Sequence, residues 1–401
     1  MSTNILETID PRELGRELQA ARKSRGMTQD EAAQMIAVTR TTITAIEKGE
    51  RRIKAGELIK LAQAYGRQIS DFAHPSPGLS LANVRLRGPA HLTEHEHSEL
   101  DRAIDDARED VRNYLELEQL MVAPLTRKYP LEYPVAGIPA SQAAETIAIQ
   151  ERNRLGLGDG PLQGLRDILE QEVGVRIFYL PLHPLTVSGL YFYAEPIGAC
   201  IGINVLHPEE RRLWSLAHDY GHFLIARHKP MVSLVDAEYQ RVPEEERLVD
   251  AFAMCFTMPT SSIMRRVNGI KQFAGRITPT DLLVQAYSYG VSVEAFTRRV
   301  ESLKLLPAGT WDRLLERGFT LREAQAKLEI APAQGQDQRF SGRYQLLAVS
   351  AFVNGKIAEG QLARFLRVDR LEARQIVETL QQQIPESLDM VDAQLQETPT
   401  R

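Results

Sequence analysis

The sequence predicts a mainly α-helical protein with a small β-sheet, an α+β fold, and three observations support this prediction. Apolar residues recur at helical spacing over most of the chain. Short apolar, β-branched and aromatic runs, typical of strands, gather between residues 173 and 205. Two stretches rich in proline, glycine and small polar residues interrupt the helices. These breaks are AHPSPGLS at 73–80 and APAQGQDQ at 331–338.

The breaks predict four parts of the chain. We expect an all-α N-terminal domain at 1–72, a linker with a connecting helix at 73–149, a mixed central domain at 150–330 and a small helical C-terminal module at 339–390.

The composition is typical of a globular cytoplasmic protein. The chain has 401 residues, of which 43% are apolar and 25% charged. No apolar run approaches the ~18 residues of a membrane span, and the first residues do not have the pattern of a secretory signal. We therefore expect a cytoplasmic protein without a membrane partner. The two cysteines, Cys200 and Cys255, are too few for a disulfide framework or an all-cysteine zinc site.

Charge is unevenly distributed along the chain. Residues 11–60 carry eleven Lys and Arg against seven Asp and Glu, whereas the whole chain has a formal charge of −5. A basic module on an acidic body is expected where one end of a protein contacts nucleic acid. An array of surface helices with mixed charge would give a similar count, so charge alone does not decide between the two interpretations.

The N-terminal domain should consist of short amphipathic helices. They are expected at about 12–24, after Thr28, at 40–48 and at 55–65, with Thr28 and Glu31 forming a capping box. Two short helices joined by a tight turn are the arrangement that places a recognition helix in the major groove of DNA. The expected DNA contacts are Thr28 and Gln29, then Arg40, Thr41, Thr42 and Thr44 at the recognition helix, and Lys48, Arg51 and Arg52 at the phosphates.

Three segments of this domain resemble the XRE-type (Cro/C1-like) helix-turn-helix family. They are TQDEAA at 28–33, TTITAIEKG at 41–49 and LIKLAQAY at 58–65, and the resemblance covers about residues 11–70. It implies binding to a double-stranded DNA operator, and we expect a homodimer that reads half-sites about one helical turn apart. The alternative is a helical module that only mediates dimerisation.

The central region should begin with a connecting helix at 93–121, which Thr93 and Glu96 cap. A helix at 162–172 should precede strands at 173–182, 187–193 and 199–205. After Pro208 the pattern is helical to about Lys304.

One of these helices carries the pattern of a metal site in the segment LAHDYGHFL at 216–224. His218 and His222 are four residues apart, so both imidazoles project from one helix face and can bind one ion. Asp219 directly follows the first histidine, where a carboxylate can take a proton from a water at the metal. Two histidines at this spacing also occur by chance in an apolar helix.

A second helix supplies acidic residues. Glu246 and Asp250 lie four residues apart in EEERLVDAFAMCFTMP at 244–259. A carboxylate from a following helix is the third ligand of the two-histidine, one-glutamate zinc class, and this role fits Glu246. Asp250, one turn further on, can accept the free ring N–H of a ligating histidine. The alternative is a charged stripe on an amphipathic helix.

Together these two motifs resemble the ImmA/IrrE family of metallo-endopeptidases, over about residues 150–306. The resemblance also includes GIN at 202–204, PEERR at 208–212 and YGVSV at 289–293. It implies a zincin-like fold in which His218, His222 and Glu246 bind Zn²⁺ and Asp219 stands at the position of the general base. It also implies a repressor or antitoxin-like protein as substrate, in a stress, phage or mobile-element response.

Asp219 departs from the family pattern, which has glutamate at this position. Aspartate is one methylene shorter, and misplacement by about 1 Å can cost a hundredfold in rate. Three interpretations stay open: the helix lies closer to the metal, hydrolysis is weak, or the domain is a zinc-bound sensor.

The C-terminal module should be a small three-helix bundle over about 344–380, and in outline it resembles a second helix-turn-helix. A docking or dimerisation module explains its pattern equally well. For the whole chain, the leading hypothesis is a DNA-binding regulator with a zinc endopeptidase domain. The alternatives are a repressor whose zinc domain senses a ligand and a purely structural helical adaptor.

Overall fold

The computed structural model describes residues 10–65, 72, 93–229, 231–234, 243–320 and 339–383. The chain divides into two compact units, Met1–Ser80 and Leu81–Arg401. Both predicted linkers, at 73–80 and 331–338, lie outside the described residues. None of the helices within the described ranges is both long enough and apolar enough to span a bilayer.

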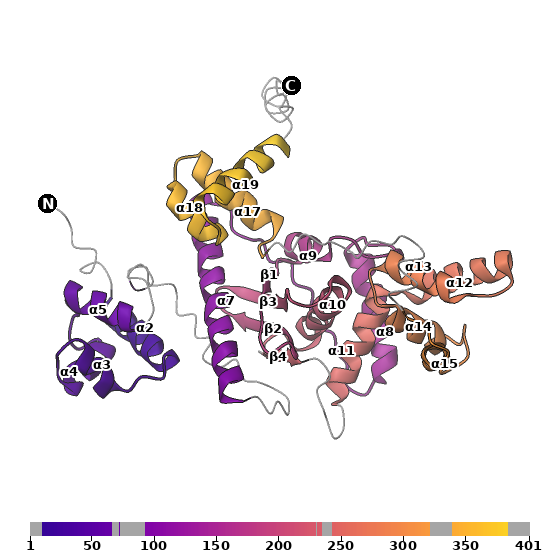
Figure 1. Ribbon diagram of the computed structural model, residues 1–401, viewed down its shortest axis with the longest axis horizontal. Coiled ribbons are helices and arrows are strands. Elements are labelled where there is room, and N and C mark those ends of the chain that lie inside the picture. Colours follow the sequence, from indigo (N-terminus) through magenta and orange to yellow (C-terminus); the bar gives the residue numbers. More distant parts are fainter. Residues whose placement is uncertain are drawn as a thin grey trace. The chain divides into compact units, whose positions relative to one another are not determined.

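The described part of the first unit is all-helical. Its helices are α2 (Pro11–Ser24), α3 (Gln29–Met35), α4 (Arg40–Glu47) and α5 (Ala55–Tyr65) (Figure 1). Thr28 caps α3 in a capping box with Glu31, and Thr39 caps α4. The helices bury one apolar cluster made by Leu14, Leu18, Ala21, Ala32, Ala33, Ile36, Ile43, Ile46, Ile53, Leu58, Leu61, Ala62, Tyr65 and Phe72.

The second unit is mainly helical with a small sheet, as the sequence predicted. The helices α7 (Glu94–Met121), α8 (Ala140–Arg154) and α9 (Leu165–Ile168) and the π-helical turn η2 (Leu169–Val173) precede the sheet. The strands are β1 (Arg176–Leu180), β2 (Val187–Ala194), β3 (Gly198–Asn204) and β4 (Met231–Leu234).

The sheet has the order β1-β3-β2-β4. Strand β1 runs parallel to β3, whereas β2 runs antiparallel to both β3 and β4. The prediction of continuous helix after Pro208 is therefore wrong at β4. A strand of four residues is too short for a recognisable period of two, and it is defined instead by its pairing with β2.

Two helices carry the candidate metal-binding residues. These are α10 (Glu209–Ala226) and α11 (Glu244–Thr257), and α10 packs on β2 and β3 (Figure 1). The core between the sheet and these helices contains Ile177, Tyr191, Ile201, Leu216, Phe223, Val249 and Phe252. The helices α12 (Thr260–Ala274), α13 (Pro279–Tyr289), α14 (Val293–Ser302) and α15 (Thr310–Glu316) bury a second cluster of their own.

The C-terminal helices α17 (Gly342–Val353), α18 (Glu359–Leu366) and α19 (Arg370–Gln383) form a small bundle, and α17 packs against α7 (Figure 1). Asp110 of α7 is fully buried and forms ion pairs with Arg339 at 2.7 Å and Arg367 at 2.6 Å. Glu118 of α7 pairs with Arg343 at 3.0 Å and with Arg176 at 2.7 Å. Buried ionic contacts thus join the end of the described chain to the connecting helix.

Candidate metal centre and nucleic-acid interface

Three side chains from α10 and α11 converge on one point. His218 and His222 lie one turn apart on α10, and their Nε2 atoms are 3.1 Å from each other. Glu246 at the start of α11 places Oε2 3.5 Å from Nε2 of His218 and 3.6 Å from Nε2 of His222. The structure therefore brings together the three residues that the sequence suggested as metal ligands.

This arrangement fits a zinc ion. Donor atoms bonded to one tetrahedral zinc at ~2.1 Å lie about 3.4 Å apart, close to the three separations here. Two imidazoles and one carboxylate are also the ligand set of hydrolytic zinc sites, which keep a fourth position for water or substrate. The His222 side chain is 1% exposed and that of Glu246 is 21% exposed, so the cluster can be reached from one side.

A carboxylate lies behind each imidazole, and the one behind His218 is within hydrogen-bond distance. Asp250 accepts from Nδ1 of His218 at 3.0 Å, which leaves Nε2 of that ring for a metal. Glu245 lies 3.7 Å from Nδ1 of His222 and 3.1 Å from Lys229. Sequence reasoning named Asp250 and missed Glu245, although its position directly before Glu246 was a usable signal.

The acidic neighbours change the pKa values of the cluster in the metal-free protein. Burial alone would lower the pKa of His218, but Asp250 and Glu246 raise it to about 10. Burial would raise the pKa of Glu246, but hydrogen bonds with the two histidines lower it well below its usual range. Protons and a metal ion would therefore compete for the same two rings.

Asp219 lies between α10 and the sheet. It is fully buried, and Ser233 of β4 donates a hydrogen bond to Oδ1 at 2.5 Å. Oδ2 has no hydrogen-bond partner among the described residues, and it faces Gly189 of β2. Burial raises the pKa of Asp219, although the charges of the two histidines and the bond from Ser233 oppose the rise. Sequence reasoning did not find Ser233 or Gly189, because their places depend on the pairing of β2 with β4.

The neighbouring Tyr220 points away from the cluster. Its hydroxyl donates to Glu151 at 2.5 Å and accepts from Arg154 at 3.0 Å. It is therefore occupied within the packing of α8 against α10.

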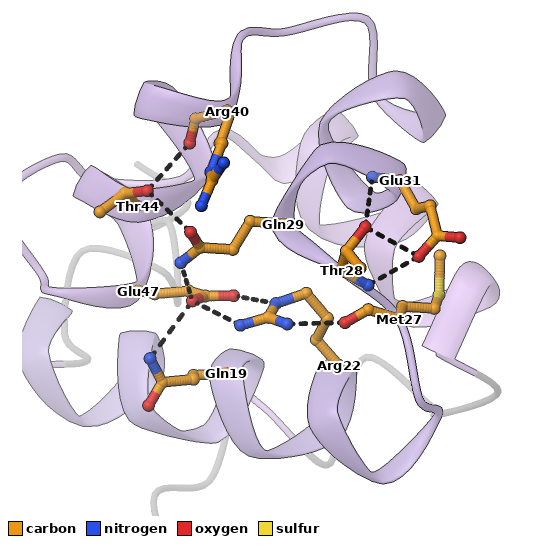
Figure 2. Close-up of polar contacts among 9 residues, drawn as sticks. All are labelled: Gln19, Arg22, Met27, Thr28, Gln29, Glu31, Arg40, Thr44 and Glu47. Carbon is orange, nitrogen blue, oxygen red and sulfur yellow. Dashed lines mark hydrogen bonds and ion pairs between the residues drawn. The ribbon is translucent and has the colours of Figure 1, made fainter.

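In the first unit a buried acid organises the helix-turn-helix. Glu47 of α4 is 5% exposed and accepts hydrogen bonds from Arg22, Gln29 and Gln19 (Figure 2). Arg22 also donates to the carbonyl of Met27 at 2.6 Å, directly before the N-cap of α3. Glu47 thus ties α2 and the start of α3 to the end of α4.

Most of the residues expected at DNA lie at the surface around α4. Thr44 donates to Oε1 of Gln29 at 3.2 Å (Figure 2), and Arg40 forms an exposed ion pair with Asp30 at 3.4 Å. Thr41, Lys48 and Arg52 are exposed and Thr42 is half-buried, whereas Thr28 is engaged in the cap of α3. Arg51 donates to both carboxylate oxygens of Glu57, so its guanidinium is already engaged within the unit.

Two family models match separate parts of the chain, in agreement with this two-part organisation. A helix-turn-helix family model matches residues 18–72, and the model of the IrrE N-terminal-like domain, a peptidase family, matches residues 170–301. No curated protein matches the chain. Among solved structures, the chain is similar to the crystal structure of ComR from Streptococcus suis. The two share 10% sequence identity, the match covers 94% of this chain and 95% of that chain, and the TM-score is 0.16.

The two family matches identify a helix-turn-helix domain, of a DNA-binding type, and a peptidase-type domain in one chain. More specifically, the chain is a fusion of an XRE-type helix-turn-helix domain with an IrrE/ImmA-like domain, as the motifs of the sequence indicated.

Proposed function

We propose that this protein is a DNA-binding transcriptional regulator whose second unit is a zinc-dependent endopeptidase that acts on a protein partner. The observation that supports it most is the convergence of His218, His222 and Glu246 at separations suited to one tetrahedral ion. These residues would hold Zn²⁺, and the bound ion would polarise a scissile carbonyl and an attacking water.

The protein's own residues have distinct roles in this proposal. Asp250 and Glu245 orient the two imidazoles, and Asp219 takes a proton from the attacking water. The hydrogen bond from Ser233 to Oδ1 holds that carboxylate, while Oδ2 has no partner among the described residues. A raised pKa suits a group that must accept and then release a proton.

Two groups of residues would contact DNA. Base edges or phosphates would be contacted from α4 by Arg40, Thr41, Thr42 and Thr44. The flanking DNA backbone would be contacted by Thr28, Gln29, Lys48, Arg51 and Arg52. Arg51 would have to leave Glu57 to do so. We propose a homodimer on a double-stranded operator. The protein substrate would be a repressor or antitoxin-like protein, in a stress, phage or mobile-element response.

Metal analysis of the purified full-length chain tests the centre. We expect one zinc per chain, which is lost in His218→Ala and Glu246→Ala. In the matched control His228→Ala, which removes an exposed histidine, zinc should be kept. Full metal content in Glu246→Ala would overturn its role as third ligand.

Incubation of the full-length chain with candidate repressor proteins tests the activity. Asp219→Asn keeps the shape of the side chain and removes the base, so cleavage should vanish while zinc stays bound. Cleavage that persists in this variant would refute the role of Asp219.

A second function, a zinc-containing sensor without hydrolysis, is favoured by one observation. The carboxylate of Asp219 is fully buried against the sheet and bonded to Ser233. For a sensor we expect bound zinc, intact DNA binding and no cleavage of any repressor by either the unaltered protein or Asp219→Asn.

A further inference from the structure

The turn between α18 and α19 repeats the turn between α3 and α4. Ala37 and Arg367 are both left-handed, with φ of 56° and 52°, and each is followed by a valine and then by the N-cap of the next helix. Residues other than glycine seldom adopt this conformation. Thr39 caps α4 by accepting from the amide of Thr42. Asp369 caps α19 in the same way, at the amide of Glu372.

The hydrogen bonds around the two turns also correspond, always at the same spacing in the sequence. The amide of Val38 donates to the carbonyl of Ala33 at 3.0 Å, and that of Val368 donates to Ala363 at 3.1 Å. The capping contact of Glu31 with the amide of Thr28, at 2.7 Å, has its counterpart between Gln361 and Ala358, at 2.8 Å.

Contacts between the two helices of each pair correspond as well. Gln29 at the start of α3 accepts from Thr44 of α4 at 3.2 Å. At the equivalent positions, Glu359 of α18 accepts from Arg374 of α19 at 2.6 Å. The buried residues Ala32, Ala33, Ile36 and Ile43 of the first pair correspond to the buried Leu362, Ala363, Leu366 and Ala373 of the second. The matches to known families, at 18–72 and 170–301, do not extend to this second pair.

The two faces of the C-terminal bundle differ in what they contact. On one side Arg364 and Arg367 form ion pairs with Glu116 and Asp110 of α7. On α19, Arg370 and Arg374 are exposed at the positions that correspond to Arg40 and Thr44 of α4. Arg374 is bonded to both carboxylate oxygens of Glu359 and would have to leave them to contact DNA. Glu372 and Glu378 lie on the same helix, so the two arginines stand in a face of mixed charge.

We propose that α18 and α19 form a second helix-turn-helix and that α19 contacts duplex DNA through Arg370 and Arg374. The turn, the caps and the interhelical contact that the two pairs share support DNA as the ligand of α19. The corresponding elements of the first unit lie in the region that matches a helix-turn-helix family. The exposed start of α19 is the part of such a motif that enters the major groove. The chain then carries two DNA-contacting modules.

The salt dependence of DNA binding by the full-length chain tests this proposal without a known operator. The probe is a fluorescent random-sequence duplex several helical turns long, and the readout is anisotropy over a range of salt concentrations. Each phosphate contact contributes about 0.9 to the slope of log K against log salt. For the double variant Arg370→Ala/Arg374→Ala we expect a slope reduced by up to about 1.8 and weaker binding at low salt.

The matched control is Arg265→Ala/Arg298→Ala, which removes two exposed, ion-paired arginines from α12 and α14. An unchanged slope in the α19 double variant, or an equal reduction in the control, overturns the proposal. Arg40→Ala separates the two modules: if it weakens binding while the α19 variant does not, only the first unit binds DNA. Absence of binding by the unaltered chain refutes both modules. Because Arg374→Ala also removes the contact with Glu359, amide exchange of residues 342–383 checks that the bundle stays folded. The single variant Arg370→Ala leaves that contact in place and should still reduce the slope by about 0.9.

Discussion

The carboxylate of Asp219, on α10, lies against the backbone of Gly189, on β2, in the space that a side chain at Gly189 would occupy. A Cβ added to Gly189 would lie 2.4 Å from Oδ2 of Asp219 and 3.1 Å from the carbonyl oxygen of Gly202. The strand therefore lacks a side chain at the position where the carboxylate of Asp219 lies against it. The position of Asp219 depends on this glycine as well as on Ser233.

We expect Gly189→Ala to lower the free energy of unfolding by about 1–3 kcal/mol, because the added methyl overpacks a closed site. Urea unfolding followed by the fluorescence of the two tryptophans, Trp214 in α10 and Trp311 in α15, measures this effect. Gly269→Ala is a matched control, since a Cβ there meets nothing within 4 Å. Equal stability of the two variants would show that Asp219 can move aside without cost.

The two carboxylates behind the histidines should contribute unequally to metal affinity. Asp250 lies within hydrogen-bond distance of His218, at 3.0 Å, whereas Glu245 is 3.7 Å from His222. We expect Asp250→Ala to weaken zinc binding by about 10–100-fold, and Glu245→Ala to weaken it less. Competition with a chromophoric chelator measures both affinities. A larger effect of Glu245→Ala would contradict this ranking.

The metal-ligand candidates could be named from the sequence because helical spacing alone places His218 beside His222 and Glu246 one turn before Asp250. Ser233 and Gly189 could not, because they reach Asp219 only through the register of β2 with β4. The contact of Asp110 with Arg339 and Arg367 was equally inaccessible, since it joins distant segments of the chain. Local periodicity thus predicts which residues share a helix face, whereas contacts across strands need the structure.

The first unit should lose stability in acid through Glu47. Burial would raise its pKa, but hydrogen bonds from Arg22 and Gln29 lower it below the ordinary value of 4.5. Its stabilisation is therefore present above that value and lost as the pH falls through the lower, folded-state pKa. Amide exchange of residues 10–65 in the full-length chain, measured from neutral to acidic pH, reports this loss.

In Glu47→Gln this part of the pH dependence should disappear. Stability at neutral pH should fall by about 3 kcal/mol, because Arg22 keeps a buried charge without its partner. Glu50→Gln, an exposed change in the same unit, is the control. If Glu47→Gln loses stability in acid as the unaltered protein does, another titrating group is responsible for that loss.

Glycine should have opposite effects at the two corresponding turns. At Ala37 it relieves a left-handed alanine and should stabilise the first unit by about 0.5–1 kcal/mol. At Arg367 it removes ion pairs with Asp110 at 2.6 Å and Glu109 at 3.1 Å, so Arg367→Gly should destabilise the C-terminal bundle. Amide exchange of each segment in the full-length chain compares them. Faster exchange around Ala37→Gly would contradict the first expectation.

Asp110 should hold the C-terminal bundle on α7. Asp110→Ala leaves the partly buried Arg339 and Arg367 without their shared carboxylate, and we expect a cost of about 3–5 kcal/mol. Residues 342–383 should then be cleaved faster in limited proteolysis. The control is Asp101→Ala, at an exposed position of the same helix. Equal cleavage rates in both variants would mean that apolar packing alone retains the bundle.

The ion pair of Arg22 with Glu47 also constrains how this sequence can diverge. Replacing either residue alone leaves a buried charge, so each single step passes through a protein of low stability. Descendants of this chain should therefore keep both residues or exchange both for a neutral pair. Because Glu47 also binds Gln29, such an exchange would free the residue at the start of α3 and alter its surface. Divergence inside this domain is thus coupled to divergence in what it can recognise.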